Sequence, residues 1–157
     1  QSQDYQKLIR EYKRATGEVE VDMHKVAAWG VEHMGVKLPK PISALDLLAK
    51  KISQAAREET RLDPSTKRHY RANHAVVYTK NGVQQSFWVD IDEAPRSLMH
   101  RSLQTRRKQM LGDAYQLALD CDHWNSIHPD EEPIQMSFDF TDDINERKSL
   151  DDQDDVA

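Results

Sequence analysis

Four side chains in the middle of the chain could together hold a divalent metal ion. Asp90, Asp92 and Glu93 are close in sequence, and His74 precedes them on a stretch that we expect to pair with theirs. Hard cations prefer several carboxylate oxygens, so this set would suit a metal-dependent nuclease. The same carboxylates, at the end of a strand and before Pro95, equally suit capping and a surface position. We therefore expect no metal, catalytic residue or cofactor. A metal-dependent nuclease is the third of three hypotheses, and the other two are given at the end of this subsection.

A second candidate site comprises Cys121, His123 and His128, which could bind zinc or supply a thiol nucleophile. Their spacing matches no usual zinc pattern, and no fourth ligand is evident. Cys121 is the single cysteine, so it cannot form a disulfide within the chain. We expect it to be a small core residue, with Trp124 packed nearby.

Charge is distributed unevenly along the 157 residues. Residues 1–49 hold seven Lys or Arg and seven Asp or Glu, residues 50–110 hold 13 against 6, and residues 111–157 hold 2 against 14. A DNA-binding surface needs such a basic middle, because Lys and Arg that neutralise phosphates release counterions. The alternative is a solvated surface that the acidic end of the chain balances.

The segment Gln135-Met136-Ser137-Phe138-Asp139-Phe140 has a glutamine, a small or polar spacer and a pair of bulky apolar side chains. It resembles the short peptide by which bacterial replication and repair proteins dock on the sliding clamp. The resemblance covers these residues only, and Phe138 stands where leucine is usual. It implies a partner-binding set in which Gln135 occupies a polar pocket and Phe138 and Phe140 a hydrophobic one, with Met136 between them.

The same segment also has the pattern of a half-buried strand. Its apolar residues Ile134, Met136, Phe138 and Phe140 alternate with polar ones. It could therefore add a third strand to a hairpin, and both interpretations remain open at this point.

Apolar periodicity predicts three helices in the first part of the chain. The first covers residues 4–16 and ends at Gly17, and the second has Asp22 as N-cap and ends at Gly35. Residues 36–42 contain two prolines and should be an extended connector. Ser43 with Asp46 resembles a capping box that begins a third helix, which we expect to reach about Leu62.

One face of the third helix is basic, because Lys50, Gln54, Arg57 and Arg61 recur at helical spacing. Such a stripe could lie along a phosphate backbone or be an ordinary solvated face. The remaining predicted DNA-binding residues come from the hairpin region and the helix after it: Lys67, Arg68, Arg71, Lys80, Arg101, Arg107 and Lys108.

Residues 73–91 are predicted to form a β-hairpin, because Asn81-Gly82 suits the positive φ angles of a two-residue type I′ turn. The turn fixes the register, with Lys80 opposite Val83, and hence Val76 opposite Phe87 and Tyr78 opposite Gln85. The residues expected to share one face and cover the core are His74, Val76, Tyr78, Phe87, Val89 and Ile91.

A long helix is predicted from Pro95, either continuous or broken near Gly112. Residues 141–157 are almost entirely polar and acidic, so we expect a disordered tail after one compact domain over residues 1–140. No apolar run approaches the roughly 20 residues of a membrane helix, and no signal-peptide pattern is present. We therefore expect a cytoplasmic protein without a membrane partner.

The expected fold class is α+β, mainly α, and the order helix, helix, helix, hairpin, helix resembles a winged-helix module. We interpret the chain as a non-enzymatic, DNA-associated accessory protein of a bacterium or its phage. It would bind duplex DNA through its basic middle and a replication clamp through its tail. The alternative is a protein-interaction subunit that does not bind DNA.

Overall fold

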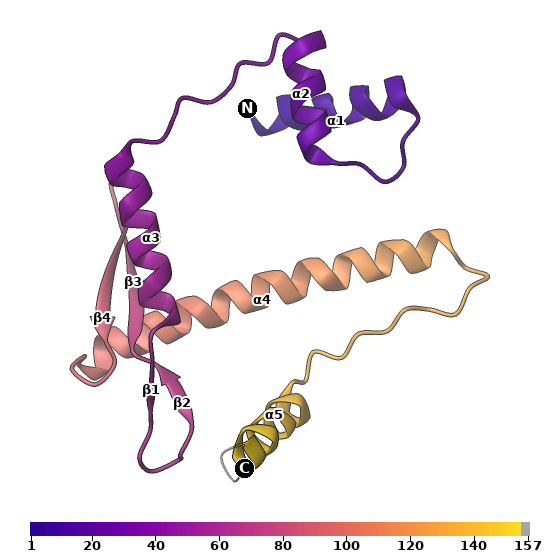
Figure 1. Cartoon of the computed structure of the whole chain (residues 1–157). Coiled ribbons are helices and arrows are strands. Elements are labelled where there is room, and N and C mark those ends of the chain that lie inside the picture. The colour runs from indigo at the N-terminus through magenta and orange to yellow at the C-terminus, as the bar shows by residue number, and fades with distance from the viewer. Residues whose placement is uncertain (155–157) are drawn as a thin grey trace. The chain divides into compact units, whose positions relative to one another are not determined.

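The computed structural model describes residues 1–154, which form five helices and two antiparallel hairpins (Figure 1). The helices are α1 (Ser2–Thr16), α2 (Met23–His33), α3 (Ala44–Glu58), α4 (Arg96–Ile127) and α5 (Thr141–Asp154). One hairpin pairs β1 (Thr60–Leu62) with β2 (His69–Arg71), and the other pairs β3 (Asn73–Lys80) with β4 (Val83–Asp90). The fold class is therefore α+β and mainly α, as predicted. Among the described residues, no helix has the length and apolar character needed to cross a membrane.

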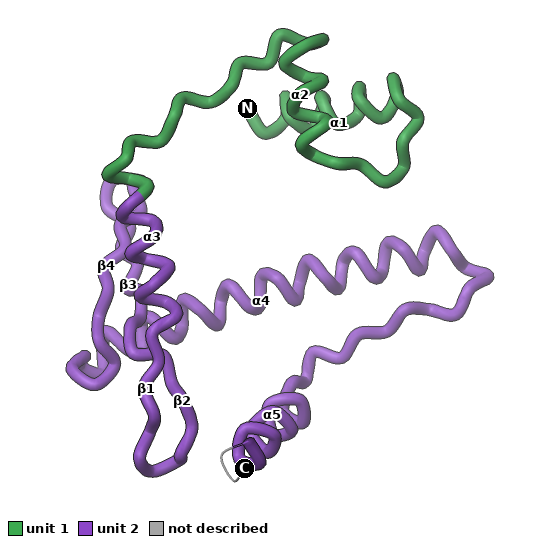
Figure 2. The backbone as a smooth tube through the Cα atoms, viewed as in Figure 1, with its two compact units in different colours: residues 1–47 green, residues 48–157 purple. Residues whose placement is uncertain are grey.

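Contacts divide the chain into two compact units, residues 1–47 and residues 48–157 (Figure 2), whereas the sequence predicts one domain over residues 1–140. The boundary falls in the first turn of α3. The preceding residues 35–43 form neither helix nor strand, in agreement with the predicted connector. Pro39 and Pro41 lie there, and they remove two backbone donors from any regular structure.

The first unit is a pair of helices, and its first two predicted helices are confirmed. Leu8 and Tyr12 of α1 are buried against Val26 of α2. Gly30 allows this close packing, because a Cβ added to it would lie 2.7 Å from Leu8 Cδ2. Asp22 caps α2 by accepting a 2.8 Å hydrogen bond from the backbone N–H of His24.

The hairpin β3–β4 forms with the predicted turn and register. Asn81 and Gly82 have φ angles of 53° and 76°, which the type I′ turn requires. Lys80 pairs with Val83, and Val76 lies opposite Phe87 as expected.

Helix α4 covers the free edge of β3. Since Lys80 and Val83 form a hydrogen-bonded pair at the turn, alternate residues Ala75 and Val77 direct their backbone groups away from β4. Ser102 of α4 donates a 2.6 Å hydrogen bond to the Ala75 carbonyl oxygen, and Arg101 Nε donates to that of Val77 at 3.2 Å. Side chains of α4 thereby bind backbone carbonyl groups of an edge strand that could otherwise pair with another strand.

The predicted core face of the hairpin is buried over part of its length. His74 and Val76 are buried, and Tyr78, Val89 and Ile91 are half-buried. Phe87 remains 55% exposed, although its ring packs against Tyr78 with centroids 5.8 Å apart.

The predicted end of the third helix is wrong. α3 begins as expected, with Ser43 Oγ accepting from the Asp46 N–H at 3.1 Å, but it ends at Glu58 and not at Leu62. Residues 60–62 instead form β1, and the side chain of Asp63 closes a turn by accepting from the Ser65 N–H. An aspartate followed by Pro64 favours such a turn over a continued helix.

The long helix α4 is continuous through Gly112, so the two-helix alternative is wrong, and Pro95 is its N-cap. A glycine in a helix costs only about 1 kcal/mol relative to alanine, which the rest of a long helix can offset.

The acidic tail is helical over most of its length, which corrects the prediction of disorder for residues 141–154. Asp139 accepts hydrogen bonds from the N–H and the hydroxyl of Thr141, and these hydrogen bonds lower the pKa of its carboxyl group. Asp142 and Asp143 follow in the first turn of α5. Negative charge at a helix N-terminus is stabilising, so the acidic composition favours this helix start. Residues 155–157 of the predicted tail lie outside the described residues.

Candidate nucleic-acid interface

The polar face of α3 and one face of the hairpin β3–β4 border a groove of about 560 Å³. Cross-strand neighbours Ala75 and Trp88 lie on this face of the hairpin. The residues that α3 contributes are Ala49, Lys50, Ser53, Gln54 and Arg57. The small side chains of Ala49, Ser53 and Ala75 keep the space between helix and hairpin open.

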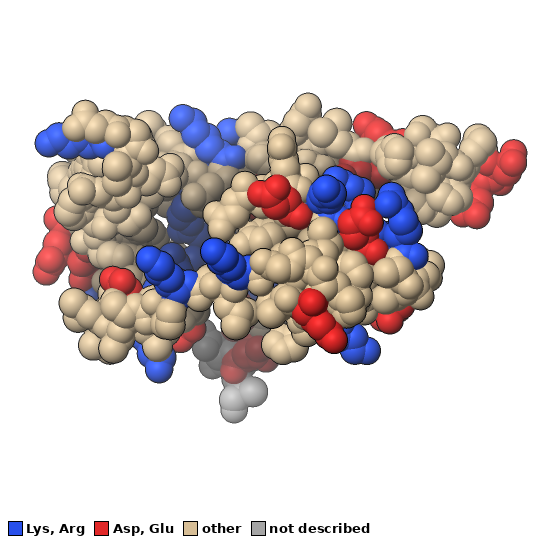
Figure 3. Space-filling view, turned by 90° about the horizontal axis from the view of Figure 1, so that it is seen from above, with Lys and Arg blue, Asp and Glu red and all other residues tan. Residues whose placement is uncertain are grey.

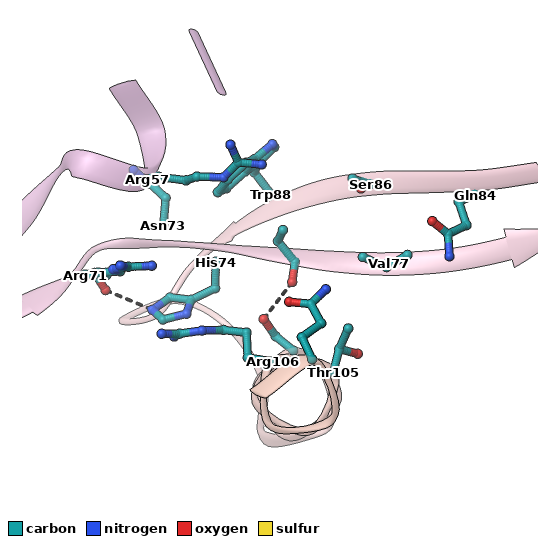
Figure 4. Close-up of a pocket in the computed structure, with 13 residues that line it drawn as sticks. Arg57, Arg71, Asn73, His74, Val77, Gln84, Ser86, Trp88, Thr105 and Arg106 are labelled. Atoms are coloured by element: carbon teal, nitrogen blue, oxygen red, sulfur yellow. Dashed lines mark hydrogen bonds between the residues drawn. The ribbon is translucent and has the colours of Figure 1, made fainter. Parts of the chain in front are cut away.

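This groove adjoins a cleft of about 340 Å³ beside α4. The two share Arg57, Ala75, Ser86 and Trp88, and together we call them the basic groove. Figure 4 shows Arg57 and Trp88 on one side of β3 and His74, Thr105 and Arg106 on the other. The basic groove therefore extends around the edge of β3 that α4 covers.

Four cations from three elements line the basic groove. Lys50 and Arg57 come from α3, Arg71 from β2 and Arg106 from α4, and no Asp or Glu is among the lining residues that the structure describes. Basic and acidic side chains are interspersed on the face shown in Figure 3. The basic groove is thus a local concentration of positive charge, which suits an anionic ligand with several phosphates.

An aromatic ring lies among these cations. The guanidinium carbon of Arg57 is 5.6 Å from the ring centroid of Trp88, a cation–π arrangement. Asn73 fixes the end of α3 against the hairpin, because its side-chain amide donates to the Ala56 carbonyl oxygen and to the Glu59 carboxylate. These contacts hold Arg57 beside Trp88.

The structure brings together four of the predicted DNA-binding residues, namely Lys50, Gln54, Arg57 and Arg71. Arg61 is elsewhere, because α3 ends before it. Its guanidinium donates to Asp90 at 2.6 and 2.8 Å and to Asp92 at 2.7 Å. These hydrogen bonds raise the pKa of Arg61 and lower that of Asp90 to about 2. Arg61, Asp90 and Asp92, which we call the Arg61 cluster, tie β1 to the end of β4.

The other predicted DNA-binding residues are dispersed over the second unit. Arg68 donates to Asp152 at 2.8 Å, and Arg101 lies over the Tyr78 ring at 4.4 Å. Lys67 occupies the β1–β2 turn with a φ angle of 59°. Lys80, Arg107 and Lys108 are exposed and line neither part of the basic groove.

The predicted DNA-binding set omits Arg106 and Trp88, which both line the basic groove. The hairpin register could have placed Trp88 opposite Ala75, on the face away from the predicted core. The sequence gives little indication that Arg106 lies in the basic groove, because its position depends on which face of α4 packs against β3.

The third-strand interpretation of residues 134–140 is wrong, because this segment pairs with no strand of the described chain. The backbone of Ile134 is held by Asn125 of α4, whose amide group donates to its carbonyl oxygen and accepts from its N–H, both at 2.9 Å. The side chains of Met136, Phe138 and Phe140 remain between 42% and 50% exposed. Alternating polarity here marks an extended segment without a partner strand.

The residues considered for metal binding have other contacts. Asp90 and Asp92 bind Arg61, and His74 Nε2 is 2.9 Å from the Arg71 carbonyl oxygen. The ring of His128 stacks on Trp124 with centroids 4.1 Å apart. Within residues 1–154, no three His, Cys, Asp or Glu side chains are grouped so that they could hold a metal ion.

The chain was compared with known protein families, sequences and structures. No protein-family model, curated protein sequence or solved structure matches the chain.

Proposed function

We propose that this chain is a non-enzymatic, DNA-associated accessory protein of a bacterium or its phage, which binds DNA phosphates in the basic groove. The observation that carries the proposal is the convergence of Lys50, Arg57, Arg71 and Arg106 on one groove, whose lining among the described residues includes no Asp or Glu. These residues are separated by up to 56 positions in the chain (106 − 50), so their convergence is a product of the fold.

The physical basis is electrostatic. Each phosphate that a Lys or Arg neutralises releases counterions, so affinity falls steeply as salt is added. The cation–π contact with Trp88 leaves the Arg57 charge in place, whereas the carboxylates around Arg61 compensate its charge. We therefore expect the basic groove, and not the Arg61 cluster, to supply the phosphate contacts.

Fluorescence anisotropy with labelled DNA at several salt concentrations tests this proposal. Arg71→Ala and Arg106→Ala should each weaken binding and lower the slope of log affinity against log salt by roughly 0.7 on a single strand or roughly 0.9 on a duplex. Arg10→Ala is the matched control, because Arg10 is an exposed residue of α1 in the other unit. Binding that is absent at low salt, or equally sensitive to all three changes, refutes the proposal.

A second function is supported by the segment Gln135–Phe140, which we propose docks on a bacterial sliding clamp. Its apolar side chains are half-exposed and belong to no strand, so they are accessible to a partner groove. Gln135→Ala and Phe138→Ala should abolish binding to purified clamp in a surface-plasmon-resonance assay. Ser137→Ala, between them, should bind like the parent chain. Equal affinity for all variants, or none for the parent, ends this proposal.

A further inference from the structure

We infer that the ligand of the basic groove is single-stranded nucleic acid, with a base stacked at Trp88 and phosphates bound by the surrounding arginines. The inference rests on the proposed DNA binding and specifies the form of DNA. It replaces the duplex that the sequence alone suggested.

The cations of the basic groove line a hollow. Proteins that read duplex DNA insert a protruding helix or ribbon into a groove of the nucleic acid. Here Lys50 and Arg57 border a space between α3 and the hairpin, and Arg106 borders the cleft that continues from it. A concave site needs a ligand that can enter it. A single strand is flexible enough to do so, whereas a duplex stays straight over this length scale.

An aromatic side chain, Trp88, also lines the hollow. Sites for single strands combine a positive groove with aromatic rings on which bases stack without regard to sequence. Trp88 is half-buried in the basic groove, with Arg57 over its ring and Arg71 lining the same cleft. The combination offers a stacking partner and phosphate contacts within one site.

The space between α3 and the hairpin is lined in part by small side chains. The side chain opposite Trp88 is Ala75, and Ser53 of α3 also lines the groove. Larger side chains at these positions would fill the space between the helix and the hairpin. The gap that remains is bordered by Lys50 and Arg57 and by the ring of Trp88, so it suits a ligand that is both flat and charged.

Amide side chains complete the site. Gln84 and Gln109 line the α4 part of the basic groove, and each amide can both donate and accept a hydrogen bond. Such groups can bind base edges or sugar hydroxyls of any sequence. We therefore expect little sequence preference.

The test compares a labelled oligo-dT strand with a duplex of equal length in anisotropy titrations of the full chain. The expected result is a preference for the single strand of about tenfold or more, with Trp88→Ala removing on the order of tenfold of that affinity. Trp124→Ala is the control, because Trp124 stacks on His128 and does not line the basic groove. Circular dichroism establishes that each variant is folded.

A second variant addresses the hollow without changing charge. Ser53→Leu fills the groove with a good helix former, so it should retain the fold and weaken binding of the single strand at least fivefold. Ser149→Leu on α5 is the corresponding control, since Ser149 is exposed. If the duplex binds as tightly as the strand, or if Trp88→Ala and Ser53→Leu both leave strand affinity unchanged, the inference is overturned and DNA binding stands. If neither nucleic acid binds at low salt, both proposals fail.

Discussion

The hydroxyl of Ser102 donates a 2.6 Å hydrogen bond to the backbone carbonyl oxygen of Ala75. Ser102 is 1% exposed, and it is the buried residue of α4. The contact satisfies a carbonyl on the free edge of β3 and determines which face of α4 meets the hairpin. Arg106, one helical turn further along, is thereby placed in the basic groove.

Replacing Ser102 with alanine should lower the free energy of unfolding by about 1–2 kcal/mol, because the Ala75 carbonyl oxygen loses its side-chain partner in a buried position. Urea denaturation followed by circular dichroism measures this change. Ser126→Ala is the matched control, since Ser126 is an exposed serine of the same helix. Its effect should stay within about 0.5 kcal/mol. Equal effects of the two changes would contradict this account of the α4 contact.

Gly82→Val should destabilise the second unit by about 1 kcal/mol or more, because a β-branched residue is strained at the φ angle of 76° found there. Asn81→Gly is the control, since glycine readily adopts the φ angle of 53° at that position. Thermal denaturation of the two variants distinguishes strain in the turn from a general effect of substitution. A valine variant as stable as the parent would be inconsistent with the type I′ turn.

The Arg61 cluster should make stability depend on acidity at low pH. Hydrogen bonds from Arg61, and then from the Asp92 N–H, lower the pKa of Asp90 to about 2. A carboxylate with a lowered folded-state pKa stabilises the fold fully above its unfolded pKa of about 3.9, and this contribution is lost as pH falls through the folded value. Asp90→Asn should therefore lower the melting temperature at neutral pH, and the two proteins should converge as pH approaches about 2. A difference that persists undiminished at that pH would be unexpected.

Ending the chain at Glu132 should leave the melting temperature of the second unit within about 2 °C of the parent value. The removed part includes the Gln135–Phe140 segment, which contributes half-exposed side chains and no strand pairing. Differential scanning calorimetry measures the change. The truncated chain should also lose binding to the clamp. A large fall in melting temperature would show instead that the segment is an integral part of the fold.

The hairpin β3–β4 could be predicted to the residue pair because its determinants are local. Asn81 and Gly82 specify the turn, and a two-residue turn fixes every pair that follows. The hairpin β1–β2 could not be predicted in this way. Its strands have three residues each, too few for a period to be visible, and their pairing depends on tertiary contacts such as that of Arg61 with Asp90.

The basic groove could be predicted only in part, because some of its residues come together through tertiary contacts and not through local sequence. Lys50 and Arg57 lie on one helix, so periodicity placed them together, and the structure retains that placement. Arg61 does not line the basic groove, because α3 ends at Glu58, before reaching it. Arg106 lies in the basic groove because Ser102 contacts Ala75, and no pattern along the chain reveals that contact.

Phosphate binding in the basic groove can be tested by the salt dependence of DNA binding after removal of all four groove cations. The variant carries Lys50→Ala, Arg57→Ala, Arg71→Ala and Arg106→Ala, and its affinity for an oligo-dT strand is measured by anisotropy across a salt series. If each cation neutralises one phosphate, the slope of log affinity against log salt should fall by about 3 relative to the parent chain, since each contact on a single strand contributes roughly 0.7. A slope that matches the parent value would show that DNA binds elsewhere and that the basic groove does not hold the phosphates.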